Sequence, residues 1–238
     1  QDVPPEEKFQ LQAYALKSTD STSVIEVLDE LFPDGREEFD YQALMAALQE
    51  YANPRDKVTA LLRRGDIIRV KKGLYVFGDE LRRRPYSREL LANLIYGPSF
   101  VSLDSALSFH GLIPERVEAL TSVTTKRPKS FQTPVGSFIY RQSPPGAFHL
   151  GMDRVEEGDV AFLIATPERA LADKVRDDRG HALSNREEAA RYLFDDLRID
   201  EEGFRQLDPC HLEELARALR SRKVATCAAL LRTLRSKQ

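Results

Sequence analysis

Basic side chains between residues 54 and 88 carry the strongest chemical signal in this sequence. The segment holds 11 lysines and arginines but only 4 acidic residues, so its formal charge is +7. Because the whole chain carries −3, everything outside the segment carries −10. Clustered guanidinium and ammonium groups bind phosphates, and one basic region on an otherwise acidic protein is typical of a nucleic-acid reader.

Three helices are expected to precede or carry these cations. Ser23 and Glu26 have the spacing of a capping box, which predicts a helix over residues 22–31. Asp40 can cap a second helix, in which apolar residues recur at helical spacing. A third helix is expected over residues 54–64, with Asn53 as its N-cap. Pro54 is its first residue, where a missing N–H costs nothing.

A helical wheel divides this third helix into two sides. Val58, Leu61 and Leu62 share an apolar face at 100° per residue. The residues on or beside the opposite face are Asp56, Lys57, Thr59, Ala60, Arg63 and Arg64. Cations mixed with small residues on an exposed helix face suit entry into the major groove of DNA.

A basic hairpin is predicted directly after the third helix. Gly65 and Asp66 break the helix, residues 67–70 form a short strand, and residues 71–73 form a turn before a second strand over 74–77. Three helices followed by such a hairpin have the order of a winged helix-turn-helix, with the hairpin tip beside phosphates. The expected DNA contacts are Arg55, Lys57, Thr59, Arg63, Arg64, Arg69, Lys71 and Lys72. The alternative is a small helical domain with a solvated charged face.

The pattern changes after a basic linker at residues 82–85. We therefore predict two domains, a winged helix-turn-helix over 20–80 and a mixed α+β domain over 86–238 that ends in a helical tail. The expected helices of the larger domain are 87–96, 102–109, 168–176 and several after residue 185, and its expected strands are 119–125, 135–141 and 160–165.

Four segments resemble the AbiEi family of antitoxins and transcriptional regulators of bacteria. They are KKGLYVFG (71–78), PYSRELLANLIYGPSFVSLDSALSFHGLIPERV (85–117), TSVTTKRPKSFQTPVGSFIYR (121–141) and ATPERALADKV (165–175). The resemblance implies a winged helix that binds promoter DNA of its own operon, which would make the protein an autorepressor. It also implies a C-terminal domain that counters a co-encoded nucleotidyltransferase-like toxin, with direct contact left open.

Further basic and acidic groups lie in the larger domain. Lys126, Arg127 and Lys129 form a possible second contact patch, for nucleic acid or for a toxin, or else belong to a solvated loop. His110 is expected to have a structural role at a helix end. Residues 151–208 carry a formal charge of −7 and residues 211–238 carry +5, so the last helices pack on the acidic region, contact DNA flanks or bind a partner.

Nothing in the sequence indicates catalysis. Adjacent acids such as Asp177 and Asp178 point in different directions along a helix and do not by themselves make a metal site. The two cysteines and four histidines are scattered, and no glycine-rich phosphate loop is present. We therefore expect no catalytic residue, no metal and no cofactor. A cytoplasmic location is expected, because no stretch approaches the ~20 apolar residues of a membrane helix.

Three other functions compete with an autorepressor and antitoxin. The first is a stand-alone transcriptional regulator without a toxin. The second is a protein-interaction module whose basic face meets an acidic partner, and the third is a nucleic-acid-processing enzyme that uses the winged helix for targeting. The salt dependence of DNA affinity distinguishes a DNA-binding protein from a protein-interaction module, because phosphate contacts release counterions.

Overall fold

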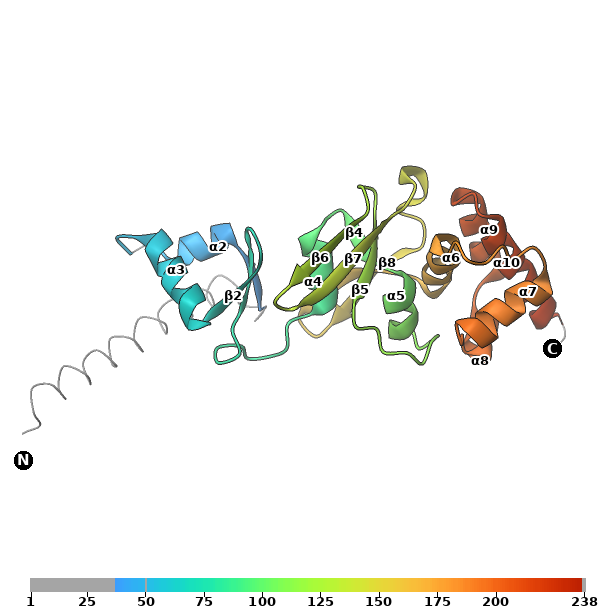
Figure 1. The fold of residues 1–238 in the computed structure, drawn as a ribbon, viewed down its shortest axis with the longest axis horizontal. Coiled ribbons are helices and arrows are strands. Elements are labelled where there is room, and N and C mark those ends of the chain that lie inside the picture. Colours follow the sequence, from blue (N-terminus) through green and yellow to red (C-terminus); the bar gives the residue numbers. More distant parts are fainter. Residues whose placement is uncertain (1–36, 50, 237–238) are drawn as a thin grey trace, which may run out of the picture. The chain divides into compact units, whose positions relative to one another are not determined.

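The computed structural model describes residues 37–49 and 51–236 and divides the chain into two compact units, 1–86 and 87–238 (Figure 1). The fold is mixed α+β: helices accompany a small sheet in the first unit and a larger one in the second. The helix expected over 22–31, with Ser23 and Glu26, lies outside the described residues.

The first unit contains a three-stranded antiparallel sheet, and two helices separate its first strand from its second in the sequence. Its elements are β1 (Glu38–Asp40), α2 (Tyr41–Ala47), α3 (Pro54–Arg64), β2 (Ile67–Lys71) and β3 (Leu74–Phe77). The strand order is β1-β3-β2, so β3 lies in the middle. Strand β1 was not predicted, because its three residues are too few to show an alternating pattern.

Local signals in the sequence explain where the two described helices of this unit begin and end. The Asp40 carboxylate accepts a hydrogen bond from the Ala43 amide at 2.8 Å and so caps α2. Asn53 precedes α3 without a side-chain capping bond, and Pro54 is its first residue. Gly65 ends α3 in the left-handed conformation, with a φ of 82°, which glycine adopts without steric cost.

A single apolar core holds the helices of this unit against its sheet. Phe39 of β1 lies between two aromatic rings of β3, at centroid distances of 6.1 Å from Tyr75 and 5.0 Å from Phe77. The other buried members of the core are Leu44, Ala47, Leu48, Val58, Leu61 and Ile67. Both helices therefore bury one apolar face each, and the opposite faces are left to solvent.

The second unit is built on a six-stranded mixed sheet with the order β6-β7-β5-β4-β9-β8 (Figure 1). The strands are β4 (Ser99–Val101), β5 (Leu120–Thr124), β6 (Lys129–Thr133), β7 (Gly136–Gln142), β8 (Met152–Glu157) and β9 (Val160–Ala165). Pairs β5–β7 and β4–β9 are parallel, and the other three pairs are antiparallel.

Three helices accompany this sheet. They are α4 (Arg88–Ile95), α5 (Leu103–Phe109) and α6 (Pro167–Asp177). Helix α4 packs on β4, β5 and β9, and the Asn93 side-chain amide exchanges two hydrogen bonds with the Leu163 backbone, of 2.6 and 3.2 Å. Helix α5 packs on β5 and on α6. Thr166 caps α6 as its Thr-Pro sequence predicts, accepting from the Arg169 amide at 3.3 Å.

A helical tail follows and gathers beside α6 (Figure 1). It comprises α7 (Arg186–Arg191), a π-helical turn (Tyr192–Asp196), α8 (Glu201–Gln206), α9 (Pro209–Ala218) and α10 (Arg222–Arg235). The apolar stripe of α10, with Val224, Cys227, Ala228 and Leu231, is buried as expected of a core-facing helix. No helix within residues 37–236 is long and apolar enough to cross a membrane.

Some details of the second unit differ from the sequence-based expectation. Strands β4, β6 and β8 were not predicted, and Lys129, expected in a loop, begins β6. Ser102 precedes α5, but its hydroxyl does not cap the helix; it donates instead to the buried Asp173 carboxylate at 2.8 Å. His110 is structural as predicted, since its Nε2 lies 2.7 Å from the Ala165 carbonyl oxygen.

The two cysteines should differ sharply in reactivity. Cys210 is exposed, whereas Cys227 is buried in α10, where burial raises the pKa of its thiol to about 12. Only a thiolate attacks alkylating and disulfide reagents, so native protein at pH 8 should release one equivalent of thionitrobenzoate from Ellman's reagent, and urea-unfolded protein two. A Cys210→Ser variant should release none until it unfolds. Two rapid equivalents from the native protein would contradict the packing of α10.

Candidate nucleic-acid interface

Helix α3 presents a polar side away from the core of the first unit. Val58 and Leu61 are buried, and Leu62 is half-buried against the same core. On the other side Arg55 and Arg63 are exposed, and so is Thr59, whose hydroxyl bonds back to a carbonyl one turn earlier. The division into an apolar and a cationic side that the wheel predicts is therefore present.

Lys57 departs from the prediction. Its residue is only 8% exposed, and its ammonium group lies 4.7 Å from the centre of the Tyr51 ring, in cation–π contact. Tyr51 precedes α3 and covers this part of the helix, which a wheel drawn from the helix alone does not include. The placement of Lys57 on the exposed side of the helix is therefore wrong, and Lys57 is left out of the proposed contacts below.

Arg64 is tied to the end of its own helix. Its Nη2 lies 2.6 Å from Asp66 Oδ2, and its Nε donates to the same oxygen at 2.8 Å. The pair is partly exposed, with 34% of the arginine side chain accessible. Arg64 thus has an acidic partner beside it, which lowers its net attraction for a phosphate.

The hairpin carries the remaining cations of the predicted set. Arg69 is exposed on β2 opposite Tyr75, Lys71 is half-buried at the end of β2, and Lys72 is exposed in the turn. Gly73 follows with a φ of 87°, so this turn needs a residue that adopts the left-handed conformation freely. A β-bulge between Arg69 and Lys71 shifts the pairing register of β2 with β3 just before the tip of the hairpin.

Four of these cations have no acidic partner within the described residues. No ion pair there involves Arg55, Arg63, Arg69 or Lys72. The cations beyond the hairpin differ: Arg82 lies 2.8 Å from an Asp79 carboxylate oxygen and over the Tyr86 ring, and Arg83 binds the buried Glu37. The charge available to a ligand is therefore concentrated on α3 and the hairpin.

The second predicted patch is partly occupied by internal contacts. Lys126 donates to the Gly97 carbonyl at 2.5 Å, and its ammonium lies 5.3 Å from the Tyr96 ring centre. Lys129 lies 4.8 Å from the Phe131 ring and 5.8 Å from the Tyr96 ring. Arg127 is exposed, and its carbonyl accepts from the Tyr96 hydroxyl. The two lysines pack over an aromatic cluster, which favours a structural role for them.

A buried polar cluster, not predicted from the sequence, joins α6 to the sheet. Arg169 is fully buried; it donates to Asp173 Oδ2 at 2.8 Å, to Ser143 Oγ at 2.7 Å, and to the Ala147 and Leu150 carbonyls at 2.5 and 2.6 Å. Burial raises the pKa of Asp173, although the guanidinium opposes the shift.

The acidic residues do not assemble into a metal site in the part of the chain that the structure describes. No group of three or more His, Cys, Asp or Glu side chains there is placed to hold an ion. Asp177 pairs instead with Arg141, with 3.0 Å between Oδ2 and Nε. Asp178 accepts from the Tyr192 hydroxyl at 3.0 Å and lies beside His181.

The chain was compared with known proteins in sequence and in structure. No family model matches the chain, and no curated protein matches it. The fold is similar to the crystal structure of the RV2827C protein from Mycobacterium tuberculosis, with a TM-score of 0.51, 14% sequence identity, and coverage of 92% of this chain and 82% of that chain. At this identity the likeness concerns the fold alone.

Proposed function

We propose that the protein is a DNA-binding transcriptional regulator whose first unit is a winged helix-turn-helix. The observation that carries the proposal is the exposed side of α3, which displays Arg55, Thr59 and Arg63 in the same unit as a basic hairpin. A helix with this exposed chemistry fits the major groove, and the hairpin supplies a wing that tracks the backbone. The function proposed is binding rather than catalysis.

The proposed contacts separate into two kinds. Arg63 and Thr59 lie on the helix and are assigned to base edges, where arginine forms bidentate bonds with guanine. Arg69 and Lys72 lie on the hairpin and are assigned to phosphates, together with Arg55 near the start of α3. Arg64 and Lys71 are secondary contacts, because each already has a partner within the chain.

The resemblance of four segments to the AbiEi family extends the proposal. The regulator would bind the promoter of its own operon and repress it, and the second unit would counter a co-encoded nucleotidyltransferase-like toxin. Co-expression tests the antitoxin role: the neighbouring reading frame should arrest growth alone and not when this chain is present. A stand-alone regulator would bind its operator but leave the growth arrest unchanged.

Titration of the full chain against its own upstream DNA tests the regulator. We expect tighter binding than to a scrambled duplex of equal length, and affinity that falls steeply between 50 and 200 mM salt, since phosphate contacts release counterions. Equal affinity for both duplexes would show that the protein does not recognise a specific operator in this DNA. Absence of binding at low salt would reject the winged helix as a DNA-binding element.

Arg63→Ala should weaken operator binding by about 1–3 kcal/mol, the usual worth of a base-edge contact. The loss should fall mainly on the operator and little on scrambled DNA, because the lost contact reads sequence. Fluorescence anisotropy with both duplexes measures the two affinities. Arg191→Ala, which removes an exposed arginine of α7 in the second unit, is the matched control and should bind like the parent. If Arg63→Ala also binds like the parent, α3 is not the recognition helix.

A further inference from the structure

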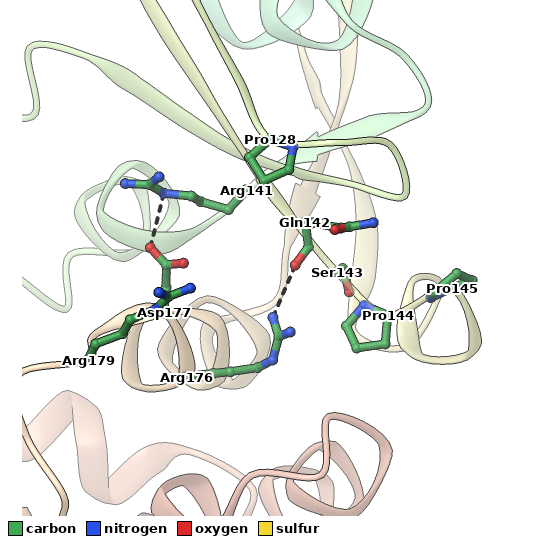
Figure 2. Close-up of a pocket in the computed structure, with 9 residues that line it drawn as sticks. All are labelled: Pro128, Arg141, Gln142, Ser143, Pro144, Pro145, Arg176, Asp177 and Arg179. Carbon is green, nitrogen blue, oxygen red and sulfur yellow. Dashed lines mark hydrogen bonds and ion pairs between the residues drawn. The ribbon is translucent and has the colours of Figure 1, made fainter.

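The second unit contains a basic cavity that the proposed DNA contacts do not use. It has a volume of about 430 Å³ and lies where β7 and α6 end (Figure 2). The lining residues are Pro128, Arg141, Gln142, Ser143, Pro144, Pro145, Arg176, Asp177 and Arg179. A volume above ~300 Å³ is in the range of small-molecule sites.

Two reciprocal bonds hold arginines from opposite walls of this cavity. Arg141 of β7 pairs with Asp177 of α6, at 3.0 Å, and Arg176 of α6 donates to the Gln142 carbonyl of β7, at 3.1 Å (Figure 2). Each of these bonds engages one nitrogen of a guanidinium group that has five N–H donors, so donors remain for a ligand. The arginines are therefore held in place before a ligand arrives, which lowers the entropy lost on binding.

The charge of the lining selects an anion. Three arginines face one aspartate, so the net formal charge is +2, and the loop that contributes Pro128 also carries Lys126 and Arg127. Guanidinium groups bind phosphate oxygens through paired N–H bonds and are the usual choice for such groups. These arginines also lie near the C-terminal end of α6, whose partial negative charge they complement. Stabilisation of this helix end is the structural alternative to ligand binding.

The rest of the lining suits a flat apolar group. Pro128, Pro144 and Pro145 contribute rings and no backbone N–H; in Figure 2 Pro128 lies beside Arg141, and Pro144 and Pro145 lie together beyond Ser143. We propose that this cavity binds a mononucleotide, with its phosphate on Arg141, Arg176 and Arg179 and its base against the proline rings. The second unit is then a ligand-binding module in addition to its role in the proposed regulator.

Calorimetric titration of the full chain with adenosine, guanosine, cytidine and uridine monophosphates tests the proposal. Inorganic phosphate and adenosine serve as the two fragments, and each should bind at least tenfold more weakly than the best mononucleotide. The double variant Arg176→Gln/Arg179→Gln should weaken that nucleotide about tenfold or more, because glutamine keeps a donor for the Gln142 carbonyl but loses the charge. Arg191→Gln is the matched control and should bind nucleotide like the parent.

Three results would overturn the proposal. They are absence of binding by every mononucleotide, adenosine binding as tightly as its monophosphate, and unchanged affinity in the double variant. Arg179→Gln alone, at an exposed residue just beyond α6, provides the same comparison if the double variant fails to fold. Operator affinity of the parent, measured in parallel, is independent of the outcome because the proposed DNA contacts lie in the other unit.

Discussion

Replacing Arg169 by methionine is expected to lower the free energy of unfolding of the second unit by about 3–5 kcal/mol. The substitution keeps an unbranched side chain of similar length but removes five N–H donors. Asp173, only 2% exposed, would lose the cation that donates to it and remain a buried carboxylate bonded by the Ser102 hydroxyl. Urea unfolding followed by circular dichroism and by Ellman's reaction of Cys227 measures the change, because Cys227 lies in α10, which packs on α6.

The size of this loss follows from what Arg169 holds together. Its guanidinium joins α6 to the Ser143 hydroxyl after β7 and to carbonyls of the turn at Ala147 and Leu150. The Cζ atom also lies 5.2 Å from the Phe100 ring centre on β4. Each buried acceptor left without a donor costs about 1–3 kcal/mol on its own, and relaxation or entry of water returns part of the total.

A solvent-exposed pair with the same helical spacing is the matched control. Arg205 and Glu201 of α8 form an i,i+4 pair in which 31% and 52% of the side chains are accessible. Arg205→Met should cost at most about 0.5 kcal/mol, as exposed helix pairs do. Equal losses in Arg169→Met and Arg205→Met would show that the buried cluster does not hold the second unit together.

The Arg169 cluster also shows what sequence reasoning misses. An arginine and an aspartate four residues apart in a helix have the spacing of an ordinary surface pair. At 100° per residue, Ala170, Leu171, Ala172 and Val175 form one apolar side of α6. Arg169 and Asp173 fall on the opposite side with Arg176 and Asp177, so a helical wheel predicts them at the surface. The partners of Arg169 come from segments 19 to 26 residues away in sequence, and no local pattern predicts them.

Prediction succeeded where local signals act alone. Helix α3 begins at a proline and is followed by a glycine, and its bounds, 54–64, agree with the expected ones. Prediction failed at the sheet edges: β6 and β8 are edge strands rich in polar and charged residues, so their alternation is weak. Lys57 was misplaced because Tyr51, outside the helix, decides its environment.

Neutralising the four cations of α3 and the hairpin for which the described residues provide no acidic partner should have the largest effect on DNA binding. In the variant Arg55→Gln/Arg63→Gln/Arg69→Gln/Lys72→Gln, the slope of log affinity against log salt should become less negative by about 2.7, since three of the four residues are assigned to phosphates and each lost phosphate contact contributes about 0.9. Affinity at low salt should fall by several orders of magnitude for both duplexes, and further for the operator, which also loses the base contact of Arg63. Anisotropy titrations at four salt concentrations give both slopes.

The helical tail provides the control that makes this result specific. Arg217, Arg220 and Arg222 are exposed at the junction of α9 and α10. They belong to the basic C-terminal segment for which contact with flanking DNA is one of the three expected roles. A triple glutamine variant at these positions removes comparable charge from the second unit. If it changes the salt slope as much as the first-unit variant does, attraction for DNA depends on the overall charge of the chain, and α3 with its hairpin is not the interface. If the slope changes only in the first-unit variant, the phosphates lie against α3 and β2, and the tail is left for another partner.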